Sequence, residues 1–226
     1  MNKKIINIIL VIFILFIGLS ICLNPVSAID SSNWKEVTIN GIDFKIPPKY
    51  NGGELIGEDN NYTTYMLETV FNFSISALNN EIDLVEVYGY ESTIDELKNI
   101  SLKRIGGHDV VILHSYRSIC EHDVIYLFYG IGDEIYAISY NGTKITPEIK
   151  EIIKNTPKSK MSKNKFYKKL DDAQASYVEK QIEYEEAYYY QEAYSAGKNS
   201  NKYDFDFVDY YSAYRIANYL MRQEHT

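Results

Sequence analysis

The sequence predicts an α+β fold, an antiparallel meander sheet with two short helices on one face, followed by a C-terminal helical hairpin. Three observations predict it. Apolar and polar residues alternate over several short segments, which is the period of a β-strand. Short turns separate these segments, so that neighbouring strands pair as hairpins. Two short helical patterns flank the central strands, and a long segment without Gly or Pro follows them.

The segment 103–141 is the centre of the predicted sheet. It reads as three or four consecutive strands. The turns between them are expected at Gly106-Gly107, at residues 118–121 and at residues 130–133. Strands this close in sequence pair as hairpins, so we expect a meander.

Further strands are expected before this centre. Asn40-Gly41 lies between two alternating apolar runs, and this dipeptide is a strong signal for a hairpin turn. Residues 69–78 alternate cleanly, which directs Asn72 to solvent. Residues 51–61 are expected to form a loop, and residues 84–90 a further strand.

Two short helices complete the sheet domain. Ser92 and Thr93, with acidic residues three positions later, form a capping-box pattern that predicts one helix. The second helix has Thr146 as its N-cap and Pro147 in its first turn, and it ends before Pro157. Its buried stripe is expected to consist of Ile149, Ile152 and Ile153.

Residues 1–28 have the layout of a secretory signal. Lys3 and Lys4 precede an apolar run over residues 5–23, and small residues up to Ala28 follow. Cleavage after Ala28 is the favoured interpretation. The alternative is an uncleaved membrane anchor, since the run is nearly as long as the roughly 20 residues that span a bilayer. Either interpretation predicts that the rest of the chain is extracellular or at the cell surface.

The chain therefore divides into three parts. Residues 1–28 are a signal peptide or membrane anchor, residues 29–157 an α+β sheet domain, and residues 158–226 a Lys-rich linker with a Tyr-rich helical tail. The lysine run at 158–169 is interpreted as a solvated linker or as the entry to a helix. A helical segment is expected at 170–196, because Gly and Pro are absent from it. A second is expected at 205–222, because its apolar residues recur at helical spacing.

The sheet domain also resembles a known group of proteins. The segments "VTINGIDFKIPPKY" and "YAISYNG…TPEIKEIIKNTPKS" look like the small exported domains of unknown role that are common in methanogenic archaea. More distantly, the order of elements is similar to PsbP-like α/β/α sandwich domains. The resemblance covers about residues 34–159, and it implies a fold and an archaeal exported protein more than a function.

Charge and cysteine content exclude some functions. The formal net charge is −8, which argues against nucleic acid as a partner because phosphates require clustered Lys and Arg. Cys120 is the only thiol after residue 28, so no internal disulfide supports the domain. No cofactor is expected. Four sequons make the exported chain a candidate glycoprotein, and their acceptors are Asn61, Asn72, Asn99 and Asn141.

One cluster could carry chemistry. His108, Cys120 and His122 are the candidates for a metal-binding or hydrolase-like activity. The spacing of paired zinc ligands is absent, and a lone thiol is more often structural, so we favour no metal site and no enzymatic activity.

Tyrosine is the other distinctive feature, with 22 in the chain. Consecutive tyrosines on a helix point about 100° apart, so they cannot all face one partner. Some therefore serve an interaction surface, or else tyrosine replaces leucine in a wet helical core. We expect an exported, non-enzymatic binding protein whose partner is a protein or glycan at the cell surface, with another copy of the chain among the candidates. The interaction candidates are Tyr184, Tyr188, Tyr189, Tyr190, Tyr210, Tyr211 and Tyr214.

Overall fold

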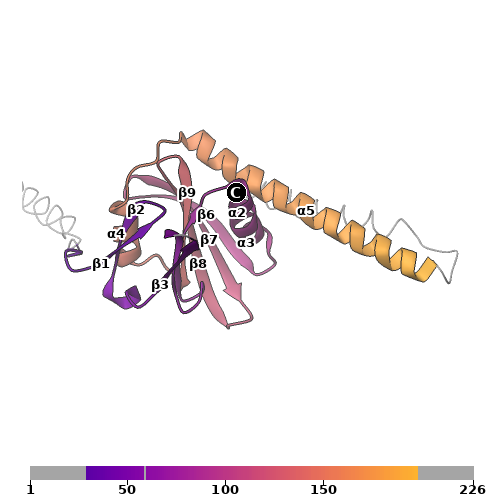
Figure 1. Cartoon of the computed structure of the whole chain (residues 1–226), viewed down its shortest axis with the longest axis horizontal. Helices are drawn as coiled ribbons and strands as arrows, with labels where there is room; N and C mark the ends of the chain where they lie inside the picture. Colours follow the sequence, from indigo (N-terminus) through magenta and orange to yellow (C-terminus); the bar gives the residue numbers. More distant parts are fainter. Residues whose placement is uncertain (1–28, 59, 198–226) are drawn as a thin grey trace, which may run out of the picture. The chain divides into compact units, whose positions relative to one another are not determined.

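The computed structural model describes residues 29–58 and 60–197 (Figure 1). The chain divides into two compact units, Met1–Ser32 and Asn33–Thr226, and the sheet with all its helices belongs to the second. The predicted signal or anchor at 1–28 and the predicted helix at 205–222 lie outside the described residues. Among the helices of the described residues, none is long and apolar enough to span a bilayer.

The fold is α+β, as predicted, and is built on a seven-stranded sheet whose paired strands are all antiparallel. The strand order is β3-β4-β5-β9-β8-β7-β6. The strands are β3 (Glu54–Glu58), β4 (Asn61–Leu67), β5 (Phe73–Leu78), β6 (Leu97–Ile105), β7 (His108–Arg117), β8 (His122–Ile131) and β9 (Glu134–Asn141).

The predicted meander corresponds to β6–β9. Leu113 pairs with Tyr126, and Leu127 pairs with Ile138. Side chains along each strand alternate between the two faces of the sheet, and here both faces are apolar and buried. Ile112 and Leu127 belong to the core on one face, whereas Leu113 and Tyr126 belong to the core on the other. The long apolar runs of these strands therefore reflect burial on both sides.

One face of the sheet, the hairpin face, is covered by a two-stranded hairpin and a helix. The hairpin pairs β1 (Lys35–Ile39) with β2 (Ile42–Ile46) around Asn40-Gly41, and both turn residues have positive φ (49° and 72°), as predicted. A short 3₁₀ turn, η1 (Pro48–Tyr50), follows.

The helix on this face is α4 (Pro147–Lys154), which the sequence predicts correctly. The Thr146 hydroxyl accepts a hydrogen bond from the Ile149 amide at 3.4 Å, which caps the first turn. The expected stripe is completely buried, and its members are Ile149, Ile152 and Ile153.

The other face, the helix face, is covered by a helical segment and by a long helix. The segment consists of α2 (Glu81–Leu84), η2 (Val85–Gly89) and α3 (Tyr90–Thr93), and the long helix is α5 (Lys163–Gly197). Both lie on the same side of the sheet in Figure 1. The sequence predicts two short helices on one face, but the structure places α4 on the hairpin face and the segment α2–α3 on the helix face.

The first half of α5 belongs to the sheet domain. Phe166, Leu170 and Ala173 are buried in the core of the helix face. Gly89 allows the close approach, since a Cβ there would lie 2.6 Å from the Cβ of Tyr177. The lysine run at 158–169 is therefore largely the entry to a helix, the second of the two interpretations offered for it.

Three local predictions are wrong. Residues 84–90 form helix instead of a strand, because Leu84 and Tyr88 share one buried helical side and Asn80 caps the segment through the Asp83 amide at 2.9 Å. Ser92 and Thr93 end this segment instead of starting a helix, since both hydroxyls donate to the Gly89 carbonyl. The chain then forms the edge strand β6.

The third wrong prediction concerns residues 51–61. They include the strand β3, which pairs with β4 at the opposite edge of the sheet. The pairing shifts register between Ile56 and Gly57, which is typical of a β-bulge at a sheet edge. Gly and acidic residues occur in this strand because only Leu55 among its five residues packs against the core.

Candidate functional site

A groove with a volume of about 570 Å³ lies on the hairpin face, bounded by the strands β6, β7 and β8, by α4 and by the loop before α4. Its floor is aliphatic and is formed by Ile105, Ile112 and Ile125, one from each strand. Ile145 adds an apolar wall. Its volume falls within the range of about 300–1,000 Å³ that is usual for ligand sites.

The rim of this basic groove is cationic. The described Lys and Arg residues that line it are Lys103, Arg104, Lys144, Lys150 and Lys154, and His114 lines it as well. All five of these Lys and Arg residues are exposed, in a chain whose formal net charge is −8. The concentration of positive charge on an acidic protein makes this surface attractive to anionic groups.

Among the residues that the structure describes, one acidic side chain lines the basic groove. Glu151 lies on α4, and its carboxylate accepts hydrogen bonds from the Lys154 ammonium at 3.0 and 3.2 Å. Asn99, Ser101 and Thr143 contribute neutral polar groups. The arrangement can hold acidic groups along the rim and apolar groups on the floor.

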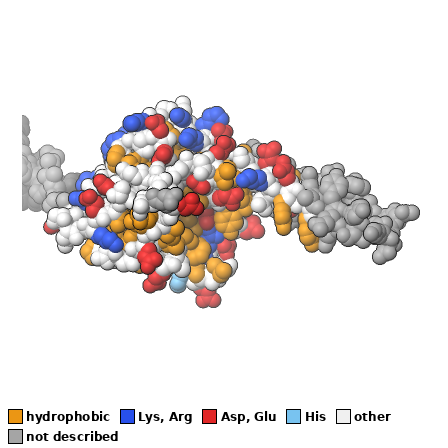
Figure 2. Space-filling model, in the orientation of Figure 1, with side chains coloured by type: hydrophobic (Ala, Val, Ile, Leu, Met, Phe, Trp, Pro, Cys, Tyr) orange, Lys and Arg blue, Asp and Glu red, His pale blue; other side chains and the backbone are white. Residues whose placement is uncertain are grey.

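The second half of α5 is the other candidate surface. Tyr177 is half-buried and its ring contacts that of Tyr90 at 5.8 Å between centroids. Two turns further on, Tyr184 is 70% exposed, and Tyr188 is 51% exposed. Figure 2 shows hydrophobic and acidic side chains together on this helix. The helix therefore passes from a packed part to a part that presents aromatic rings to solvent.

The other predicted tyrosines cannot be placed in the same way. Tyr189 and Tyr190 belong to α5, but their side chains lie outside the described part of the structure. Tyr210, Tyr211 and Tyr214 lie entirely outside the described residues. Of the predicted interaction candidates, the structure therefore describes the side chains of Tyr184 and Tyr188.

The alternative site at His108, Cys120 and His122 is divided between two ends of the sheet. His108 pairs with Ile105 at the start of β7, whereas His122 pairs with Arg117 at its end. The His108 ring is buried, with Nδ1 3.0 Å from the Gly130 carbonyl oxygen, and burial lowers its pKa. In residues 29–58 and 60–197, no three His, Cys, Asp or Glu side chains form a group that could hold a metal.

The glycosylation candidates differ in exposure. Asn61 and Asn99 are exposed. Asn72 is half-buried, although the alternation predicts that it points to solvent. Its amide nitrogen donates to Glu68 Oε2 at 2.7 Å, and its carbonyl oxygen accepts from Asn141 Nδ2 at 3.0 Å. Asn72 and Asn141 are therefore engaged with each other, whereas the other two acceptors are presented to solvent.

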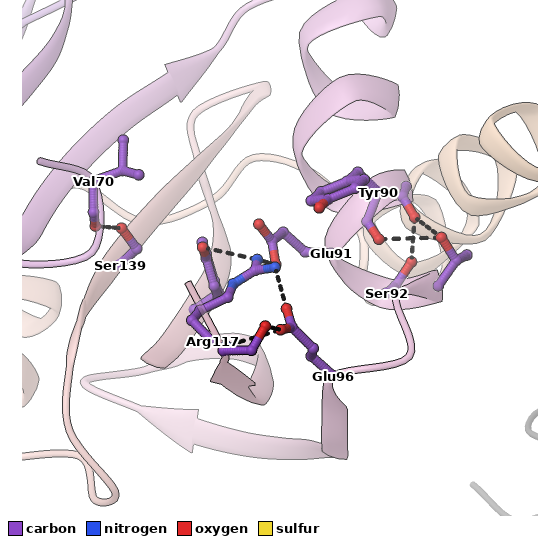
Figure 3. Close-up of polar contacts among 11 residues, drawn as sticks. Val70, Tyr90, Glu91, Ser92, Glu96, Arg117 and Ser139 are labelled. Atoms are coloured by element: carbon purple, nitrogen blue, oxygen red, sulfur yellow. Dashed lines mark hydrogen bonds and ion pairs between the residues drawn. The ribbon is translucent and has the colours of Figure 1, made fainter. Parts of the chain in front are cut away.

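A buried charged cluster joins α3 to the sheet (Figure 3). Arg117, at the end of β7, forms ion pairs with Glu91 of α3 and with Glu96, and it donates to the Tyr126 hydroxyl at 3.2 Å. The side chains of Arg117 and Glu91 are 4% and 8% exposed. The rings of Phe71, Tyr90 and Tyr126 lie 5.5–5.7 Å from the Arg117 guanidinium carbon.

The electrostatics of this cluster are those of a structural contact between two elements. Burial raises the pKa of Glu91 to about 7, and the Arg117 charge opposes that rise. Hydrogen bonds from Ser118 lower the pKa of Glu96. Glu96 therefore remains an anionic partner for Arg117 when Glu91 takes up a proton.

Neither the basic groove nor the charged cluster was found from the sequence. The groove combines β6, β7, β8, α4 and the loop before α4, so no local motif marks it. The one available signal is the stripe of Ile149, Ile152 and Ile153, which leaves Lys150 and Lys154 on the solvent side of their helix. The Arg117–Glu91 pair carries no sequence signal, since residues 84–90 read as a strand.

Comparisons with protein-family models, with curated proteins and with solved structures find no match for this chain. The resemblance to archaeal exported domains and to PsbP-like domains stays a prediction.

Proposed function

We propose that this chain is an exported, non-enzymatic binding protein of the cell surface, and that it makes its contacts through the Tyr-rich helical tail. The observation that carries the proposal is the 70% exposure of Tyr184, on a helix whose earlier turns are buried in the sheet domain. Tyrosine is enriched in interfaces because its ring supplies apolar area at little entropic cost while its hydroxyl makes hydrogen bonds.

The division of α5 into two parts supports this role. Phe166, Leu170 and Ala173 already anchor the helix to the core. Lys180 lies 3.4 Å from Glu86 of η2. The helix then continues for several turns past this ion pair. An exposed aromatic surface that continues beyond the anchored part of a helix is typical of a site that binds a partner.

The partner we propose is a protein or glycan at the cell surface, another copy of this chain included. Export accounts for the location, since the segment at residues 1–28 has the layout of a secretory signal. Exposed aromatic rings suit either class, because they stack on sugar faces and pack in protein interfaces.

Binding to cell envelopes tests the proposal. The mature chain, residues 29–226, is compared with a chain that ends at Lys180, because this truncation keeps Phe166, Leu170 and Tyr177 and thus the anchored part of α5. We expect the mature chain to bind envelopes prepared from the source cells and the truncated chain to lose that binding. Thermal unfolding of both chains verifies that the sheet domain is retained.

A matched control distinguishes specific binding by the tail from nonspecific hydrophobic binding. Ile119, at the turn between β7 and β8, is 84% exposed and lies outside the tail. Ile119→Ser removes an exposed apolar side chain and is expected to leave binding unchanged. Equal binding by the mature and truncated chains contradicts the proposed role of the tail.

A further inference from the structure

We propose that the basic groove binds an acidic oligosaccharide, a short chain of sugars that carry carboxylate or sulfate groups. The groove belongs to the sheet domain and not to the tail, so this binding goes beyond the proposed function and shares with it only the expectation of export. Cationic, neutral polar and aliphatic side chains all line the groove. An acidic sugar has a complementary group for each of these three kinds.

Three cations of the groove are free to receive an anion. Lys103 lies on β6, Lys144 in the loop before α4 and Lys150 on α4, so separate elements bring them to one groove. Within the described part of the chain, none of these three forms an ion pair. Lys154 differs, because it is paired with Glu151 and leaves that carboxylate no longer available to the others. Unpaired charges of one sign repel each other, and a bound anion removes that repulsion.

The cationic surface continues beyond the groove. Arg104 lines both the groove and a second hollow of about 430 Å³, which Lys158 and Lys163 line as well, together with Asp109. The Lys158 ammonium donates a hydrogen bond to the Gly106 carbonyl oxygen, which positions it without cancelling its charge. A cationic surface that covers two hollows suits a ligand with several negative charges along its length better than it suits a single small anion.

The neutral groups of the groove match the uncharged parts of a sugar. Asn99 and Ser101 come from β6, and Thr143 comes from the loop before α4. Amide and hydroxyl side chains both donate and accept hydrogen bonds, as sugar hydroxyls do. Ile145 is half-buried and offers a small apolar surface to the C–H groups of a sugar ring.

The floor of the groove argues against a lipid or an acidic peptide. Ile105, Ile112 and Ile125 are at most 6% exposed, so the bare apolar area is small. An acyl chain needs apolar surface along its length, and a peptide derives most of its affinity from apolar side chains that it buries in pockets. A sugar needs only a narrow apolar strip, since its remaining groups are polar. An acidic oligosaccharide therefore fits the groove best.

Calorimetric titration of the mature chain, residues 29–226, tests the assignment. The probes are an oligogalacturonate, which carries carboxylates, a sulfated dextran oligosaccharide, and a neutral dextran oligosaccharide of the same length. We expect saturable binding of at least one charged probe, and the tighter of the two identifies the acidic group. The neutral probe is expected to bind at least about tenfold more weakly, because it lacks the charge-assisted hydrogen bonds. Equal binding of all three probes, or no binding of either charged probe, overturns the inference.

Variants locate the binding. Lys144→Gln with Lys150→Gln, the groove variant, is expected to weaken binding at least about tenfold, because two charge-assisted hydrogen bonds are lost. The control, Lys165→Gln with Lys169→Gln, makes the same change in net charge at exposed positions of α5 outside the groove and is expected to bind like the unmodified chain. Equal weakening in both variants shows general charge attraction and contradicts a site in the groove.

A further variant distinguishes sugar recognition from attraction between charges. Ser101→Ala removes a hydroxyl but no charge, and it is expected to weaken oligosaccharide binding about threefold or more. The same variant is expected to bind polyglutamate, an acidic chain without hydroxyls, as the unmodified chain does. Polyglutamate or phosphatidylglycerol vesicles that bind more tightly than either acidic oligosaccharide, and lose that binding in the groove variant, assign the groove to a peptide or a lipid and overturn the inference.

The sequon at Asn99 provides an independent test, because Asn99 lines the groove. The protein for the titrations is produced in a host without N-glycosylation, which keeps the groove open. Mass spectrometry of the native protein is expected to find Asn99 unmodified. A glycan on Asn99 in the native protein would occupy the groove and overturns the inference.

The chain that ends at Lys180 separates this binding from the proposed function. It keeps every residue of the groove, so we expect it to bind the acidic oligosaccharide as tightly as the mature chain does. If the tail is required for envelope binding but neither acidic oligosaccharide binds, only the assignment of the groove fails. If an acidic oligosaccharide binds in the groove but envelope binding does not depend on the tail, only the proposed function fails.

Discussion

Removal of the Glu91 carboxylate is expected to be the most damaging single change in the charged cluster. Glu91→Ala leaves the Arg117 guanidinium, whose side chain is 4% exposed, without its nearest anionic partner. Arg117 cannot lose its proton, and breaking a buried pair by removing one partner costs about 3–5 kcal/mol. Arg117→Met is expected to cost less, because the Glu91 carboxyl that remains can take up a proton and become neutral.

The same carboxyl makes stability depend on pH. In the folded chain its pKa is about 7, above the ordinary 4.5, so the native state binds this proton more tightly than the unfolded state. The contribution to stability is fully present below pH 4.5 and is lost as the pH rises through about 7. Each unit of difference between the folded and the ordinary pKa corresponds to about 1.36 kcal/mol, so the free energy of unfolding falls by about 3 kcal/mol over this range.

Urea unfolding of the mature chain at a series of pH values measures this effect. Glu91→Gln keeps the size of the side chain and cannot titrate, so the difference in unfolding free energy between the natural chain and this variant isolates Glu91. We expect the unfolding free energy of the natural chain to fall relative to that of Glu91→Gln as the pH rises from about 4.5 to about 7. A difference that is constant across this range, or an Arg117→Met variant less stable than Glu91→Ala at pH 8, refutes the reasoning.

Three further predictions concern packing and export. Gly89→Ala is expected to lower the free energy of unfolding by about 1–3 kcal/mol, because the new Cβ meets Tyr177 at 2.6 Å, whereas Gly52→Ala, with a nearest contact of 3.6 Å, changes it little in the same urea titration. Ile152→Ala is expected to cost about 2–5 kcal/mol, and the exposed Ile119→Ala at most about 0.5 kcal/mol. Mass spectrometry of the protein from its native cells is expected to find Ile29 as the first residue. A protein that still carries residues 1–28 supports the uncleaved membrane anchor instead.

Elements with a local signal could be predicted from the sequence. The Asn40-Gly41 turn requires positive φ at two consecutive residues, and this requirement is visible in the residue types. Helix α4 has a cap, a proline in its first turn and an isoleucine stripe. The meander has short turns that leave little choice of pairing. In each case the interactions that determine the structure lie within a few residues of one another.

Elements determined by tertiary contacts could not be predicted. Residues 84–90 alternate like a strand, but burial of Leu84 and Tyr88 against α5 favours a helix. Strand β6 is polar because it is an edge strand with much of its surface in solvent, so its alternation is weak. The basic groove and the Arg117 cluster combine residues far apart in the chain, and only the folded sheet brings them together.

The central claim is that the part of α5 beyond Lys180 is a binding surface instead of a part of the core. The most direct measurement is the fraction of purified protein that sediments with source-cell envelopes, with and without residues 181–226, together with the melting temperature of each form. We expect the shorter form to melt at nearly the same temperature and to stay in the supernatant. A shorter form that sediments as fully as the mature chain, or that no longer folds, contradicts it.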